Sequence, residues 1–164
     1  MTAYPPKPSP AEAETIAALA RLLREEGLAL AVRTAAGQTL HLHGRGVSDL
    51  RRLTADPTAP LRGATVADKV VGKGAAALMA AGGVRALHAA VISRPALELL
   101  GREGVAVACD ATVPHIIRRD GRGVCPVEAA CAGTDDVAGC LAAIDRFFAR
   151  MAGGDGAHRH PDTP

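Results

Sequence analysis

One run of residues, Val66–Gly83, constrains the fold of this chain more than any other segment. It consists almost entirely of small and apolar residues, and its only charged residues lie in its first half: Asp68, Lys69 and Lys73. A helix without a polar face must be buried, and charges at one end of such a helix must reach a cleft or the surface. The pattern therefore predicts a buried helix over Val66–Gly83 that begins beside a cleft.

The amino-terminal end of this predicted helix is a candidate anion site. The first turns of a helix expose unpaired N–H groups and the positive end of the dipole, and Lys69 and Lys73 would lie four residues apart on one face. The alternative interpretation is a solvated helix end in which Thr65 and Asp68 form a capping box. Lys73 fits that alternative less well, because it lies deep in the apolar run.

Size and charge exclude several classes of protein. At 164 residues the chain is long enough for one domain with a proper core. A net charge of +2, two Phe, one Tyr and no Trp leave little with which to bind nucleic acid. The amino terminus lacks the apolar segment of a signal peptide, and the Gly/Ala-rich run is a poor membrane span. We expect a cytoplasmic protein without nucleic-acid or membrane partners, whose four cysteines are reduced thiols.

The sequence before Val66–Gly83 predicts a disordered amino-terminal segment, one helix and a hairpin. We expect residues 1–8, which are rich in proline, to be disordered. Ser9-Pro10-Ala11-Glu12 is typical of a capping box, and apolar residues then recur at helical spacing as far as Gly27: Ile16, Leu19, Ala20 and Leu23. Short β-prone segments at Leu28–Thr34 and Thr39–His43 predict an antiparallel hairpin.

The sequence after the run predicts a parallel crossover. Ala86–Ile92 and Val105–Cys109 are the apolar runs expected of buried strands. Between them Ser93 is placed to cap a helix that ends near Glu103. A strand, a helix and a second strand in this order indicate parallel strands joined by a right-handed crossover.

Two further helices complete the expected domain. One starts at Cys125-Pro126 and the last is capped by Thr134, which gives a single domain over residues 9–152. Residues 153–164 are expected to be a disordered tail, in which His158 and His160 need no metal to explain them. The order of the expected helices and strands along the chain predicts a three-layer α/β/α fold with a mixed sheet of about four strands.

Ligands of such sheets bind at the carboxyl ends of the parallel strands, where the next helices begin. Two predicted helix starts, Thr65–Lys73 and Ser93–Pro95, should therefore face each other. The loop after the last strand lies near the same cleft, and the sequence assigns no role to its polar residues, which include Thr112 and Arg118.

Three stretches of the chain resemble a known family. They are Val66–Gly83, Ile92-Ser93-Arg94-Pro95-Ala96-Leu97 and Gly123-Val124-Cys125-Pro126-Val127-Glu128. The residues of these stretches and their order along the chain resemble the domain of unknown function 1893 family. The resemblance covers roughly Leu28–Glu128. That resemblance implies a cytidine deaminase-like fold.

The zinc motifs of true deaminases are missing from the matching positions. Zinc deaminases place His-x-Glu at the start of one helix and Pro-Cys-x-x-Cys at the next. Here Val71-Gly72-Lys73 stands at the first position and Ser93-Arg94-Pro95 at the second. Neither offers a zinc ligand, and a lysine ammonium would repel the cation. We therefore expect neither zinc-dependent deamination nor any metal or other cofactor.

The same two helix starts suit a phosphorylated ligand. Lys69, Lys73 and Arg94 would bring positive potential to one place, which favours a nucleotide or ADP-ribose-like small molecule. Asp68 is expected to stay ionised beside the lysines, and to orient a ribose hydroxyl or act as a nucleophile or base. The expected ligand-binding residues are Lys69, Gly72, Lys73, Ser93, Arg94 and Pro95. Whether the protein is an enzyme stays open.

Two other classes of function stay open as well. A thiol enzyme would use Cys125, because a cysteine at a helix start can have a lowered pKa, with Glu128 or His115 assisting. The competing interpretation of Cys125 is an ordinary helix start. A scaffold or regulatory protein would instead form a homodimer through an apolar helix face. His41 and His43 share one face of the predicted hairpin, where alternating polar residues are expected in any case.

Overall fold

The computed structural model describes residues 4–156 as one five-stranded sheet with six helices. The strands are β1 (Leu30–Arg33), β2 (Thr39–Leu42), β3 (Thr65–Val71), β4 (Ala86–Ser93) and β5 (Ala106–Val113). Their order in the sheet is β2-β1-β3-β4-β5. β1 is antiparallel to both of its neighbours, whereas β3, β4 and β5 are parallel to one another.

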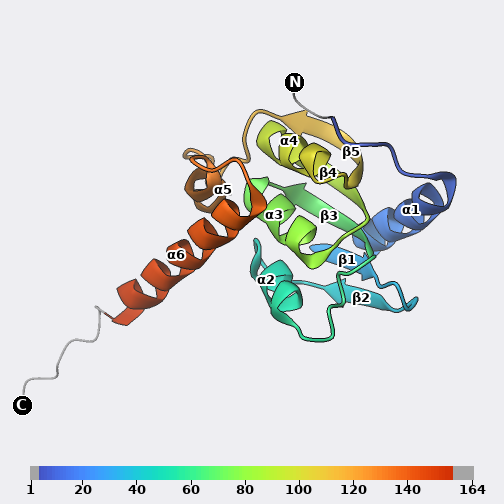
Figure 1. Ribbon diagram of the computed structural model, residues 1–164, viewed down its shortest axis with the longest axis horizontal. Coiled ribbons are helices and arrows are strands. Elements are labelled where there is room, and N and C mark those ends of the chain that lie inside the picture. Colours follow the sequence, from blue (N-terminus) through green and yellow to red (C-terminus); the bar gives the residue numbers. More distant parts are fainter. Residues whose placement is uncertain (1–3, 157–164) are drawn as a thin grey trace, which may run out of the picture.

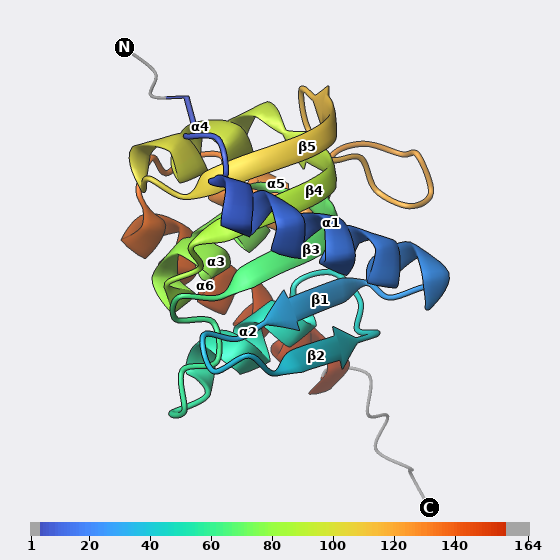
Figure 2. The same cartoon turned by 90° about the vertical axis from the view of Figure 1, so that its right-hand side faces the viewer.

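The helices form a layer on each face of the sheet. They are α1 (Pro10–Glu25), α2 (Ser48–Ala55), α3 (Lys73–Gly82), α4 (Arg94–Arg102), α5 (Pro126–Cys131) and α6 (Val137–Gly156). α1 lies alone across one face, and the other five lie on the opposite side (Figures 1 and 2). The three-layer α/β/α architecture with a mixed sheet is therefore confirmed, although the sheet has five strands rather than about four.

Several local predictions are confirmed. The Ser9 hydroxyl accepts from the Glu12 amide, and the Glu12 carboxylate accepts from the Ser9 amide, so the capping box at the start of α1 is complete. The predicted hairpin pairs β1 with β2. β4, α4 and β5 form the predicted parallel crossover, and the Ser93 hydroxyl caps α4 by accepting from the Ala96 amide.

The prediction of one helix over Val66–Gly83 is wrong. Thr65–Val71 is strand β3, and α3 begins only at Lys73, after Gly72 as N-cap. β3 is a central strand that pairs with β1 on one side and β4 on the other, and its residues Val66 and Ala67 are buried on opposite faces of the sheet. A short apolar run buried in this way carries no periodicity that separates strand from helix. Lys69 and Lys73 consequently do not share a helix face.

Segment boundaries also differ from the expected ones. β5 continues to Val113, past the predicted end at Cys109. In the amino-terminal segment expected to be disordered, Pro5 is buried and the Pro6 carbonyl accepts from the Val107 amide, 3.0 Å away. α6 runs to Gly156. His158 and His160 lie outside the described residues.

α3 is the centre of the main core. Its first seven residues are buried, and it packs against α2, α4, α5 and α6 as well as β3. Side chains from the sheet, such as Val66, Leu87 and Ile92, complete this core beneath it. A smaller cluster on the other face joins Leu19 and Leu23 of α1 to the sheet.

Candidate functional site

A cavity of about 460 Å³ opens beside the carboxyl end of β3. It lies between the end of β3, the start of α3, the chain that leads into α2, the loop after β5 and the start of α5. This volume falls within the range of small-molecule binding sites. Its position agrees with the expectation that the site lies where parallel strands end and helices begin.

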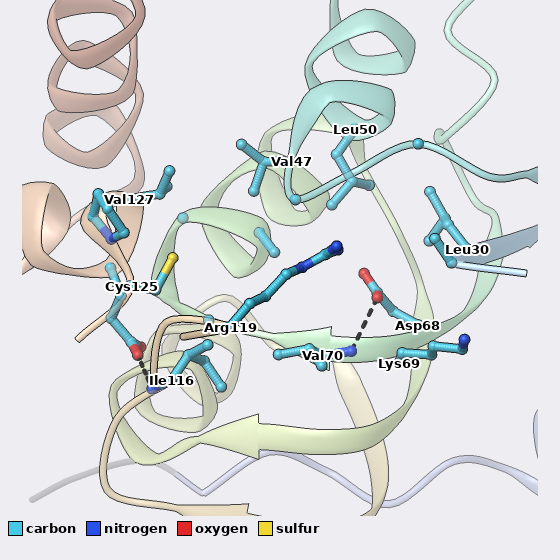
Figure 3. A pocket seen from close by; sticks show the side chains of 18 of the residues that line it. Leu30, Val47, Leu50, Asp68, Lys69, Val70, Ile116, Arg119, Cys125 and Val127 are labelled. Atoms are coloured by element: carbon cyan, nitrogen blue, oxygen red, sulfur yellow. Dashed lines mark hydrogen bonds between the residues drawn. The ribbon is translucent and has the colours of Figure 1, made fainter. Parts of the chain in front are cut away.

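The cavity has an apolar wall and a charged rim. Leu30, Val47, Leu50 and Val127 give apolar surface, and Figure 3 shows them around the cavity. Its charged residues are Asp68 and Lys69 of β3, Arg118 and Arg119 of the loop after β5, Asp49 of α2 and Glu128 of α5. In Figure 3 Arg119 extends across the cavity from the side of Ile116 towards Asp68. Apolar walls with a few convergent polar groups are typical of ligand sites.

The two arginines lie on a short hairpin that we call the arginine flap, residues 114–125. Ile117 and Val124 pair as an isolated antiparallel bridge, and the Arg118 amide donates to the Gly123 carbonyl at 2.8 Å. Figure 2 shows this loop, in orange, projecting from the end of β5. The Arg118 guanidinium lies 3.3 Å from the Asp120 carboxylate, whereas Arg119 and Lys69 make no ion pair with any residue of the described range 4–156.

Glu128 of α5 connects the flap to the helix starts. One carboxylate oxygen accepts from the Lys73 amide, 3.2 Å away, and from the Ser93 hydroxyl. The other oxygen accepts from the Ile116 amide in the flap. The side chain is 3% exposed. A buried carboxylate that receives three donors is well satisfied, and the Lys73 amide is one of the groups that a helix start leaves unpaired.

The predicted anion site at the two helix starts is therefore occupied from within the chain. The Glu128 carboxylate sits between the start of α3 and the Ser93 cap of α4. Lys73 is 6% exposed, and its ammonium donates to the Thr134 carbonyl in the α5–α6 connection rather than facing the cavity. A ligand phosphate at this place would compete with Glu128, so the helix starts are closed and the positive rim of the cavity is elsewhere.

The predicted site residues fall into two groups. Asp68, Lys69, Gly72 and Cys125 line the cavity, together with three further glycines, Gly44, Gly46 and Gly74. Lys73, Ser93, Arg94 and Pro95 are not part of its lining. Lys73 and Ser93 are buried against Glu128 and its surroundings, while Arg94 is exposed at the start of α4. The structure thus brings half of the predicted set together.

Asp68 differs from its expected state. One of its oxygens accepts from the Val70 amide at 3.2 Å, which tends to lower the pKa. Removal from water outweighs this effect and raises the pKa of Asp68 from 3.8 to about 7. The expectation that neighbouring lysines keep this carboxylate ionised is corrected, because Lys73 points away from it. Near neutral pH the Asp68 carboxyl is both an acceptor and, for part of the molecules, a donor.

The cysteines occupy different surroundings. Cys125 precedes α5 and lines the cavity, but its side chain does not cap the helix. Of its expected assistants, Glu128 is committed to its three donors and His115 is exposed on the flap. Cys131 and Cys140 are both buried; the Cys131 thiol donates to the Cys140 carbonyl at 3.9 Å, and the Cys140 thiol lies 3.1 Å from the Thr134 hydroxyl. The neighbouring Cys131 thiol, the Thr134 hydroxyl and the Lys73 ammonium lower the pKa of Cys140.

The remaining candidates lie away from the cavity. The His41 ring is 2.5 Å from the Glu26 carboxylate at the outer edge of the sheet, and neither His41 nor His43 lines the cavity. Within residues 4–156, no group of three His, Cys, Asp or Glu side chains is arranged to hold a metal ion. Over the same residues, no helix has the length and apolarity needed to cross a membrane.

Sequence reasoning missed the roles of Glu128 and Arg119. Glu128 follows Pro126 as an ordinary first-turn acidic residue of a helix, and its partners lie 35 and 55 residues earlier in the chain. Arg119 belongs to a stretch with three arginines within five residues, Arg118 to Arg122. That local density of cations, beside the end of a buried strand, was the available signal.

Comparisons with known proteins agree with this architecture. The family described as "Domain of unknown function (DUF1893)" matches residues 18–148. The crystal structure of a DUF1893 family protein, TM1506 from Thermotoga maritima, is similar with a TM-score of 0.72 and 24% identity, over 85% of this chain and 91% of that one. No curated protein matches the sequence. Because the family pattern spans most of the domain, this chain belongs to the DUF1893 family.

Proposed function

We propose that the cavity binds a phosphorylated small molecule of the nucleotide class, the group to which the ADP-ribose-like ligand expected from the sequence also belongs. The observation that carries the proposal is the position of Arg118 and Arg119 on the rim of one apolar-walled cavity of about 460 Å³, whose lining also includes Lys69. A nucleotide needs both parts, because its base and sugar bury apolar surface while its phosphate requires cationic donors.

The two kinds of surface allow an orientation to be assigned to the ligand. Val47, Leu50 and Leu30 would cover the base, since they form the apolar wall. The guanidinium groups of the flap would hold the phosphate, because arginine presents planar paired donors to phosphate oxygens. Asp68 lies among these surfaces, where a carboxyl group can bond a ribose hydroxyl or a base edge. The proposal concerns binding; it assigns no reaction.

Thermal-shift measurements with matched ligands test the proposal. A nucleoside 5′-diphosphate should raise the melting temperature, and the nucleoside without phosphate should raise it less. Ligand at one hundred times its Kd stabilises a protein by about 2.7 kcal/mol, which is easily measured. Arg119→Ala should weaken phosphate-dependent binding at least tenfold. Arg122→Ala is the matched control, because Arg122 lies on the same flap but does not line the cavity.

The other two classes give different results in the same experiments. A thiol enzyme would show a Cys125 that reacts with an alkylating reagent near pH 7 faster than a free model thiol, and no preference for phosphorylated ligands. A scaffold would show no response to any nucleotide together with a stable dimer in light scattering. If no member of a broad nucleotide panel stabilises the wild-type protein, the proposed function is wrong.

A further inference from the structure

Glu128 is placed to do more than stabilise the core. It is the side chain through which the arginine flap is bonded to the body of the domain, since Ile116 of the flap donates its amide to Glu128. The same carboxylate is fixed on its other side by the Lys73 amide and the Ser93 hydroxyl. Any change in the position of Glu128 therefore moves the point from which Arg118 and Arg119 project.

Within the described residues, the flap has few other polar attachments. Most of its backbone bonds are internal, as between the amide of Arg118 and the carbonyl of Gly123 and between the amide of Gly121 and the carbonyl of Arg118. Ile117 is 55% exposed and Val124 is 37% exposed, so both leave much of their apolar surface outside the core. Ile116 packs close to Gly72, where an added Cβ would lie 3.2 Å from the Ile116 Cγ1 atom. A segment with so few contacts takes its position from the bonds at its base.

The three donors explain why this position requires a carboxylate. Two protein N–H groups and one hydroxyl point at the two oxygens of Glu128, and both oxygens must accept. A glutamine at this position offers one accepting oxygen and one donating NH₂ group, so it would face at least one amide or hydroxyl donor with another donor. Substitution by glutamine keeps the size of the side chain and removes one of its two accepting ends.

We propose that Glu128 is a positioning residue for ligand binding: its carboxylate fixes the base of the arginine flap so that Arg118 and Arg119 face a phosphate in the cavity. The inference rests on the proposed function, because it specifies how the phosphate end of that site is set. Glu128 is part of the cavity lining, but both of its carboxylate oxygens already accept from protein donors in this arrangement. It acts through the flap, and it selects phosphorylated ligands over their unphosphorylated counterparts.

Hydrogen exchange measured by mass spectrometry or NMR tests the bond without any ligand. In the wild-type protein the Ile116 amide should exchange at least a hundredfold more slowly than an unprotected amide. In Glu128→Gln, exchange across residues 114–125 should become at least tenfold faster, while amides of α1 and β4 keep their wild-type rates. An unprotected Ile116 amide in the wild-type protein overturns the inference, and this measurement does not depend on whether a variant folds.

Ser93→Ala provides the matched control. It also removes one donor to Glu128 and weakens the cap of α4, but it leaves the Ile116 bond in place. We expect this variant to lose thermal stability while exchange in the flap stays within threefold of wild type. Equal loosening of the flap in Ser93→Ala and Glu128→Gln would show a general loss of stability rather than positioning, and would overturn the inference.

Binding measurements add a readout that a purely structural role does not change. In Glu128→Gln the Kd of a nucleoside 5′-diphosphate should rise at least tenfold, whereas the Kd of the unphosphorylated nucleoside should change less than threefold. Equal losses for both ligands would overturn the inference. If the wild-type protein binds neither ligand, the proposed function fails, and the exchange measurements alone then decide whether Glu128 holds the flap.

Discussion

The helix-start region and the cavity rim lie side by side, and both collect groups that attract anions. In the helix-start region, the Lys73 amide and the Ser93 hydroxyl are satisfied by a carboxylate of the same chain. On the cavity rim, Lys69 and Arg119 have no ion-pair partner among residues 4–156. The first region is closed and structural, whereas the second is open to a ligand. Positive potential at helix starts is therefore a poor guide to a site until the chain's own acidic residues are placed.

The strongest test of this contrast compares the two lysines first paired in the sequence. Lys73→Ala should lower the free energy of unfolding by about 2–4 kcal/mol, because it leaves a cavity and an unpaired, half-buried Thr134 carbonyl. Lys69→Ala should change that free energy by less than about 0.5 kcal/mol, because the side chain is exposed. Urea unfolding measures both variants.

For ligand binding, Lys69→Ala should have a larger effect than Lys73→Ala. Lys69→Ala should reduce the thermal shift produced by a nucleoside diphosphate, and Lys73→Ala should keep it at any temperature where the variant is folded. A Lys73 variant that is as stable as wild type but does not bind the nucleotide would reverse the assignment of the two regions.

Asp68 gives the next largest expected effect, seen as a dependence of stability on pH. Its pKa is raised from 3.8 to about 7 in the folded protein, so between these pH values the folded state holds a proton that the unfolded state has lost. Stability should therefore fall as pH rises from about 4 to 7, by roughly 1–3 kcal/mol. Asp68→Asn should remove this component, and thermal unfolding over the pH series measures it. Identical pH profiles for the two proteins would contradict the raised pKa.

Gly74 gives the smallest expected effect, at the boundary between the two regions. A Cβ there would lie 2.5 Å from Cγ1 of Val127, a branched side chain that cannot easily move aside. Gly74→Ala should cost about 1–2 kcal/mol of stability in urea unfolding, despite the better helix propensity of alanine. Gly153→Ala in α6 is the control, because its Cβ would meet no atom within 4 Å. A Gly74 variant as stable as this control would show that α3 and α5 separate easily.

Local signals in the sequence predicted much of the fold. The Ser9 capping box, the hairpin and the crossover through Ser93 each depend on residues close together in the chain, and each is present. β3 was missed because Val66 and Ala67 are both buried, on opposite faces of the sheet, which removes the alternation that marks a strand. Length alone then favoured a helix over Val66–Gly83.

The site was predictable only in part, for a related reason. Asp68, Lys69 and Gly72 were chosen as the start of a predicted helix, and they line the cavity although that segment is strand β3 and the turn after it. Cys125 was chosen as a helix start, and it precedes α5. The closure of the helix starts by Glu128 depends on contacts across 35 and 55 residues, which no local pattern encodes. The same long-range packing turns Lys73 towards Thr134 and so removes it from the site.

The composition of α3 limits the amino-acid substitutions that such a protein can accept during evolution. A helix built from two glycines, five alanines and few larger residues lets four other helices approach its axis closely. Substitutions there are limited by volume rather than by polarity, since even one methyl group reaches a neighbour. Sequence differences between relatives should therefore accumulate on the flap and in the outer part of α6. In α3 the substitutions should be limited to exchanges among the smallest side chains.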